Sequence, residues 1–99
     1  NRHRVGLDYF VTATEGLYRI YSGDLESGRQ MYRDALSIAQ SQSEKSRLRQ
    51  RMHYEIARYF EFRGETTLAA AEYKKSAKIK YGYGYLHRAA MRAARRLAG

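Results

Sequence analysis

The chain contains no cysteine, no proline and no tryptophan. Without cysteine it can form no disulfide, no thiolate metal site and no thiol nucleophile. Without proline nothing interrupts a long helix, which favours an all-α fold. Apolar runs of the ~20 residues that cross a bilayer are also missing, so we expect no membrane partner. No signal-peptide pattern opens the chain, and it begins without an initiator methionine. We therefore expect a segment of a larger intracellular, cytoplasmic protein.

Acidic side chains are scarce in the second half of the chain. The net charge is +9, and residues 51–99 hold eleven basic but only four acidic side chains, with no acid after Glu72. Such an excess attracts acidic partners, whether nucleic acid, anionic lipid or acidic peptide. The alternative is a solvated basic face that only keeps the domain soluble.

Motifs for catalysis are missing as well. The sequence has neither a phosphate-binding glycine loop nor the strand-turn-helix elbow that presents a nucleophilic serine. Its three histidines lack the i, i+4 pairing of a helical metal site, so we expect ordinary surface or boundary histidines. The glutamates of the basic second half are expected to form ion pairs. They are Glu55, Glu61, Glu65 and Glu72. We therefore expect no enzyme, no catalytic residue, no metal and no cofactor.

The chain does contain an internal repeat. Gly23-Asp24-Leu25, followed by Tyr32 and Leu36, recurs 41 residues later as Gly64-Glu65-Thr66, followed by Tyr73 and Ala77. A repeat of this length predicts helical hairpins that stack side by side, because one hairpin cannot bury its own apolar face.

Apolar spacing of three and four residues predicts five helices, at about 3–22, 24–40, 42–63, 66–80 and 84–98. Gly23 and Gly64 are expected to end the first and third helices in the left-handed conformation. Asp24 is expected to cap the second helix, and Ser41 with Glu44 forms a capping-box pattern before the third. Glu65 or Thr66 is expected to cap the fourth.

The last two helices carry distinct patterns. The fourth is expected to bury Leu68, Ala71, Tyr73 and Ala77. The fifth has an apolar stripe of Leu86, Ala90, Ala93 and Leu97, and opposite it an arginine stripe of Arg88, Arg92, Arg95 and Arg96. Between the two helices, residues 81–85 alternate tyrosine and glycine. These tyrosines either lock neighbouring hairpins together while glycine turns the chain, or stack on bases of a nucleic acid.

The repeat resembles the tetratricopeptide repeat, a helix-turn-helix unit with small residues where its helices touch. The matching positions are Gly16, Gly23-Asp24, Gly28, Tyr32 and Ala35-Leu36 in the first copy, and Ala57, Gly64-Glu65, Ala69, Tyr73 and Ser76-Ala77 in the second. The proline that closes each family unit is absent, and the 41-residue period exceeds 34, so elongated units are expected. The resemblance implies a single domain, with repeats at about 7–40 and 42–80 and a terminal helix at about 84–98.

The resemblance also implies a right-handed superhelix whose concave groove binds a peptide. By position, the residues lining it are Phe10, Ala13, Leu17, Ile20, Tyr21, Arg51, Tyr54, Arg58, Glu61 and Phe62. Two positions of the family's carboxylate clamp hold Ala13 and Leu17, so another mode of binding is required.

We therefore expect a non-catalytic protein-interaction module, part of a regulatory or scaffold protein, whose partner is a protein or peptide of acidic character. Its predicted binding residues are Leu17, Tyr21, Arg51, Tyr54, Arg58, Phe62, Arg88 and Arg92. Arginine and tyrosine are frequent binding hot spots. The alternatives are a basic nucleic-acid-binding module and a structural segment that self-associates.

Overall fold

The computed structural model describes the backbone of residues 2–98 and, within that range, every side chain except those of residues 2–8 and 10. It contains five α-helices, which are α1 (Arg2–Tyr21), α2 (Leu25–Ile38), α3 (Gln42–Phe62), α4 (Thr66–Lys78) and α5 (Gly84–Ala98). The all-α prediction is confirmed, and every predicted helix boundary lies within two residues of the observed one.

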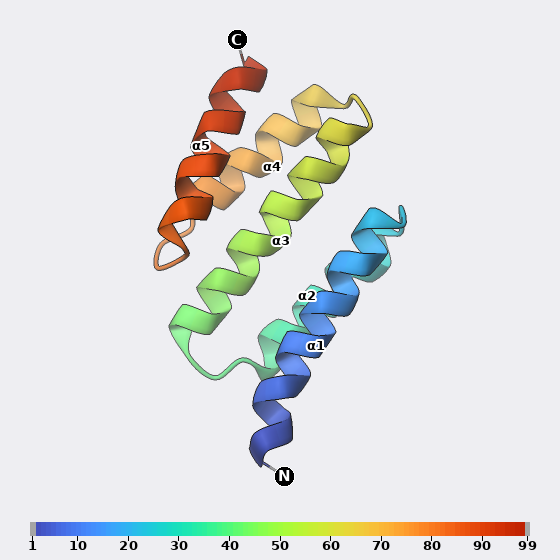
Figure 1. Ribbon diagram of the computed structural model, residues 1–99, viewed down its shortest axis with the longest axis vertical. Helices are drawn as coiled ribbons and strands as arrows, with labels where there is room; N and C mark the ends of the chain where they lie inside the picture. The colour runs from blue at the N-terminus through green and yellow to red at the C-terminus, as the bar shows by residue number, and fades with distance from the viewer. Residues whose placement is uncertain (1, 99) are drawn as a thin grey trace.

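The helices form two layers (Figure 1). α1, α3 and α5 lie side by side in one layer, and α2 and α4 lie behind them. Each helix packs chiefly on its neighbour in sequence, as stacked hairpins do, while α1 and α3 make a smaller contact. The resulting slab measures 49 × 28 × 15 Å. None of the described helices has both the length and the apolar character of a membrane span.

Local signals account for most of the helix ends. Gly23 and Gly64 have φ values of 96° and 79°, which glycine adopts without steric cost. The Asp24 carboxylate accepts a hydrogen bond from the Ser27 backbone N–H at 3.2 Å. The capping-box prediction for Ser41 and Glu44 is confirmed, since both of its hydrogen bonds are present.

The cap of α4 differs from the expectation. Glu65 occupies the N-cap position, but its side chain makes no capping hydrogen bond. Its carboxylate therefore contributes less to this helix end than Asp24 does to the start of α2.

α1 and α2 touch through two glycines. A Cβ atom on Gly28 would lie 2.8 Å from the Gly16 carbonyl oxygen and 2.6 Å from Cγ1 of Ile20. Ala57 and Ala69, at the matching positions of the second hairpin, are fully buried. Small residues thus allow close helix contact in both hairpins.

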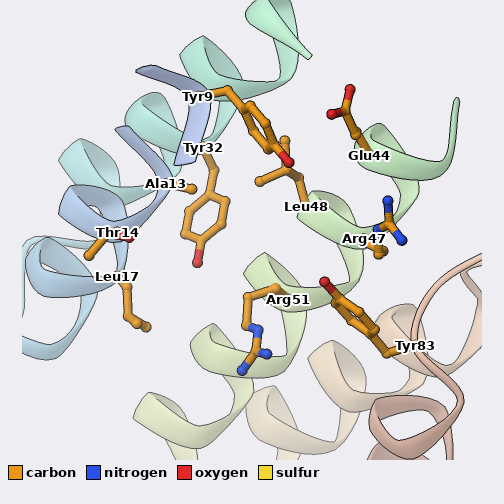
Figure 2. Close-up of a pocket in the computed structure, with 10 residues that line it drawn as sticks. All are labelled: Tyr9, Ala13, Thr14, Leu17, Tyr32, Glu44, Arg47, Leu48, Arg51 and Tyr83. Carbon is orange, nitrogen blue, oxygen red and sulfur yellow. The ribbon is translucent and has the colours of Figure 1, made fainter. Parts of the chain in front are cut away.

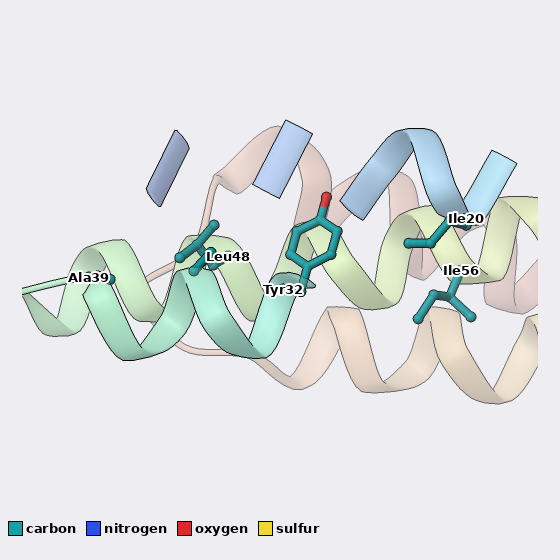
Figure 3. Close-up of a cluster of buried hydrophobic side chains, with 6 residues drawn as sticks. Ile20, Tyr32, Ala39, Leu48 and Ile56 are labelled. Atoms are coloured by element: carbon teal, nitrogen blue, oxygen red, sulfur yellow. The ribbon is translucent and has the colours of Figure 1, made fainter. Parts of the chain in front are cut away.

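The first core cluster fills the space between α1, α2 and α3 (Figure 3). It consists of Ile20, Tyr32, Ala35, Ala39, Leu48 and Ile56. Ile20 is 0% exposed, so its predicted place in the groove is wrong. Its side chain points into the hairpin core instead.

The second cluster joins α3, α4 and α5 mostly through alanines. It consists of Ala57, Ala69, Tyr73, Ala90, Ala93 and Ala94. The expected buried face of α4 is wrong in part, because Leu68 is 50% exposed and Ala71 is also exposed. The buried residues of α4 are Ala69, Glu72, Tyr73 and Ser76.

Glu72 is a buried carboxylate between the two hairpins. It lies 2.9 Å from Nζ of Lys75, 3.3 Å from Nδ1 of His53 and 3.9 Å from Nη2 of Arg29. Burial alone would raise the pKa of Glu72, but the hydrogen bonds and charges of His53 and Lys75 outweigh it and lower the pKa to about 2. The carboxylate is therefore held in its ionised form.

The loop between α4 and α5 is fixed by Gln50, which is 0% exposed. Its side chain accepts a hydrogen bond from the Tyr83 N–H at 2.7 Å and donates one to the Tyr83 carbonyl at 3.0 Å. The residue with a positive φ in this loop is Tyr81, at 65°, and the chain bends at Gly82, which follows it. Gly82 is needed for space, because a Cβ atom there would lie 2.5 Å from Cδ of Gln50.

Candidate partner-binding groove

A pocket of about 240 Å³ opens between α1 and α3, in the layer that also contains α5 (Figure 2). Its lining residues come from α1, α2, α3 and the α4–α5 loop, and they are Tyr9, Ala13, Thr14, Leu17, Tyr32, Glu44, Arg47, Leu48, Arg51 and Tyr83. The limited contact between α1 and α3 leaves this space open.

The pocket combines apolar and polar walls. Leu17, Leu48 and Tyr32 contribute apolar surface, and the last two are nearly fully buried. The hydroxyl groups of Tyr9 and Tyr83 point inward from opposite sides in Figure 2. An apolar base under a polar rim is the usual composition of a binding pocket.

Beyond the pocket, a row of side chains follows one face of α3. The row is Arg47, Arg51, Glu55, Arg58 and Phe62, whose spacing of three and four residues places them on one face of the helix. Phe62 is 91% exposed, which is unusual for a phenylalanine on a helix. We call this face of α3 the groove, together with Tyr21 of α1 and Tyr85 and Arg96 of α5, which form hydrogen bonds to α3.

Glu55 connects α1 and α3 at the centre of the groove. It is 4% exposed, and it accepts a hydrogen bond from the Tyr21 hydroxyl on α1 at 2.7 Å. Arg51 and Arg58 lie 3.5 and 3.6 Å from its carboxylate oxygens. Burial and the hydrogen bond to Glu55 raise the pKa of Tyr21 to about 12. Because Glu55 is covered, the charge exposed around it is that of the two arginines.

Two contacts join α3 to α5 along the same side. Arg51 donates to the Tyr85 hydroxyl at 3.0 Å, and Arg96 donates to the Glu61 carboxylate at 2.6 Å. The hydrogen bond from Arg96 lowers the pKa of Glu61. Arg92 lies on α5 between Tyr85 and Arg96 by helical spacing, so it extends the basic surface.

The predicted site residues occupy different environments. Leu17 and Arg51 line the pocket, and Tyr21 and Arg58 flank Glu55. Phe62, Arg88 and Arg92 are exposed. Tyr54 is half-buried and packs edge-on against Tyr73, with ring centroids 5.6 Å apart. The side chain of Phe10 lies outside the described residues.

Three residues of the pocket and the groove were not predicted from the sequence. Arg47 lies one turn before Arg51, so extending the arginine spacing of α3 toward its start would have identified it. Glu55 was expected only to form an ion pair, not to join two helices. Tyr83 belongs to a loop, and its ring position depends on Gln50, for which the sequence carries no signal.

The two histidines whose side chains the structure describes, His53 and His87, contact different residues. Nδ1 of His87 lies 2.9 Å from the Ala77 carbonyl oxygen, and Nδ1 of His53 lies 3.3 Å from the Glu72 carboxylate. In the part of the chain that the structure describes, no group of three or more His, Asp or Glu side chains could hold a metal ion.

Comparisons of the chain with known protein families, curated proteins and solved structures found no match.

Proposed function

We propose that this domain is a non-catalytic, tetratricopeptide-type interaction module whose groove binds an acidic segment of a partner protein. The observation that carries the proposal is the row on α3, in which three arginines and an exposed phenylalanine share one face. Arginine and aromatic side chains supply much of the binding energy in protein interfaces.

The order of helix packing supports the tetratricopeptide type. α1, α3 and α5 occupy one layer, which is the arrangement expected of the first helices of successive units (Figure 1). The small residues at the two hairpin contacts, Gly16 with Gly28 and Ala57 with Ala69, agree with the family pattern. The elongated unit is accommodated in α3, the longest helix, with 21 residues.

The charge of the groove supports an acidic partner. Its carboxylates are engaged, Glu55 by burial among Tyr21 and two arginines and Glu61 by Arg96. The arginines on either side carry the positive charge that faces solvent. A partner segment with several carboxylates would be attracted electrostatically and would find guanidinium donors along α3.

Selection of peptides from a random twelve-residue phage library on the immobilised domain tests the proposal. We expect enrichment of acidic peptides that also contain apolar residues, at physiological salt. Enrichment of basic peptides, or no enrichment at all, would contradict it. Sedimentation over a range of concentrations in the same buffer detects self-association that would cover the groove.

The rival function is nucleic-acid binding, for which the exposed Tyr81 and the basic α5 are the favourable features. The Tyr83 ring is less suited to stack on bases, because Tyr85 packs against it at 5.4 Å and the Arg47 guanidinium covers it at 5.5 Å. Filter-binding titrations with single- and double-stranded nucleic acid at two salt concentrations separate the functions. Tight binding that falls steeply with salt would favour the rival.

A further inference from the structure

The pocket between α1 and α3 has the size of a side-chain site. Pockets that enclose whole small-molecule ligands have volumes of roughly 300–1,000 Å³. This pocket, at about 240 Å³, is smaller and opens onto the groove between two helices. It therefore suits one side chain of a longer chain that continues along the groove.

The base of the pocket selects for an apolar group. Tyr32 and Leu48 are 2% and 8% exposed, and Ala13 and Leu17 form the wall on α1. A charged group placed on this surface would lose its hydration without a partner, whereas an aliphatic or aromatic group would gain from burial.

The rim presents two guanidinium groups that are already positioned. Arg51 is held by the Tyr85 hydroxyl at 3.0 Å and lies 3.5 Å from Glu55, and Arg47 lies over the Tyr83 ring at 5.5 Å. A guanidinium group has five N–H donors, so these contacts leave donors for a carboxylate. Because these two side chains are already positioned, less conformational entropy is lost when a ligand binds.

Glu44 is the acidic residue at the same rim. Its Oε1 accepts hydrogen bonds from the backbone N–H groups of Gln40 and Ser41, both at 3.0 Å, and its contact with the Tyr9 hydroxyl raises the pKa of that tyrosine, after the larger effect of burial. The carboxylate is thus committed to capping α3. The two arginines outweigh it, so the rim is net positive.

We infer that this pocket is the anchor site for one leucine- or phenylalanine-sized side chain of an acidic partner segment, with carboxylates beside that residue bound by Arg47 and Arg51. This inference rests on the proposed function. It names the contact that would make the groove prefer some peptide sequences over others. Charge complementarity identifies the occupant, because acids beside the anchor would pair with Arg47 and share Arg51 with Glu55, whereas an apolar segment without acids would leave the positive rim uncompensated.

The test uses the peptides enriched from the random library, synthesised with both ends blocked. We expect one apolar position to be shared among them, with acidic residues on at least one side. Replacement of that anchor by alanine should weaken binding at least about tenfold. Replacement of the flanking acids by their amides should weaken binding and reduce the salt dependence of the affinity.

Wild-type protein supplies a second measurement that does not depend on any variant. Intermolecular nuclear Overhauser effects should connect the anchor side chain of the bound peptide to the methyl groups of Leu17 and Leu48. Contacts to Phe62 or α5 alone would overturn the inference, even if the peptides bind tightly.

A matched pair of variants completes the test. Leu17→Glu places a carboxylate at the pocket wall and should remove the preference for the anchor, while Leu68→Glu makes the same change on the half-exposed face of α4 and should not. Acidic peptides that bind with no preferred apolar position would overturn the pocket assignment and leave the proposed function standing. No enrichment of acidic peptides would overturn both.

Discussion

The hydroxyl of Tyr21 on α1 and the carboxylate of Glu55 on α3 lie 2.7 Å apart, although 34 residues separate them in the sequence. This hydrogen bond joins α1 and α3, whose other contacts with each other are limited. Because Arg51 and Arg58 contact the same carboxylate, the spacing of α1 and α3 and the position of the groove arginines are set together.

Tyr21→Phe removes the hydroxyl and leaves Glu55 with its arginine partners. We expect a loss of about 1 kcal/mol in the free energy of unfolding, since a hydrogen bond to a charged acceptor is partly offset by hydration at this half-exposed position. Urea denaturation measures it. Tyr18→Phe, at a 76% exposed tyrosine of the same helix, is the control. Equal losses in the two variants would show that the Tyr21–Glu55 bond does not stabilise the fold.

Arg58→Glu reverses a half-exposed charge on the groove face of α3. We expect affinity for the selected acidic peptides to fall at least tenfold, which is about 1.4 kcal/mol. Arg51 remains beside Glu55, so the domain should stay folded by circular dichroism. Isothermal titration calorimetry measures the affinity.

The matched control for that change is Lys74→Glu, which makes the same charge reversal on the exposed surface of α4. It should weaken binding far less, because α4 lies in the other layer (Figure 1). If both variants lose affinity equally, attraction depends on net charge and not on the groove.

The pKa of Glu72 predicts a loss of stability in acid. Its value falls from 4.5 to about 2 in the folded protein, so the unfolded chain binds a proton more readily. The stabilisation is complete above about pH 4.5 and is lost as the pH falls toward 2. Between pH 6 and pH 3, this one group should account for roughly 2 kcal/mol.

Glu72→Gln measures that contribution. The variant should lose less stability than the wild type between pH 6 and pH 3, as followed by urea denaturation at the two values. Parallel pH dependence in the two proteins would rule out Glu72 as the responsible group. The remaining acid sensitivity should reflect Glu61 and Glu44, whose pKa values are also lowered.

Gly82→Ala tests the packing of the α4–α5 loop. The new methyl group would displace the Gln50 side chain, which is fully buried and holds both backbone groups of Tyr83. Leaving these polar groups unsatisfied should cost about 1–3 kcal/mol. Thermal unfolding measures the loss.

Gly84→Ala is the control for this loop. The nearest atom to its Cβ is Nη1 of Arg88, the far end of a flexible side chain, at 3.3 Å. Gly84 begins α5, where alanine is the better helix former, so stability should hold or rise slightly. A comparable loss at both glycines would show that the loop, and not Gln50, is sensitive to the added methyl group.

Features that depend on neighbouring residues could be predicted from the sequence. Asp24 and the Ser41–Glu44 pair bond to backbone groups three residues away, so spacing alone identifies them. The arginine stripe of α5 could be predicted as well, because it lies opposite the buried Leu86 and Ala90 on a regular helix.

The sequence predicts burial less well at positions where a packing partner decides whether a side chain is covered. Leu68 was expected to be buried and is half exposed, whereas Glu72 is buried because Lys75, His53 and Arg29 surround it. Ile20 was assigned to the groove by position in the repeat, yet it belongs to the buried core cluster that contains Tyr32 and Ile56. A periodic pattern ranks residues by polarity, but it does not include the partners that compensate a buried charge.

Five helices, the caps at the starts of α2 and α3 and a strongly basic second half follow from the chain itself, because each depends on composition or on residues within a few positions of one another. The link between Tyr21 and Glu55 and the position of Tyr83 depend on hydrogen bonds between residues 33 or more positions apart, and the pocket depends on residues from three helices and a loop. Such contacts exist only when α1, α3 and the α4–α5 loop have packed together, and packing geometry is what linear spacing leaves undetermined.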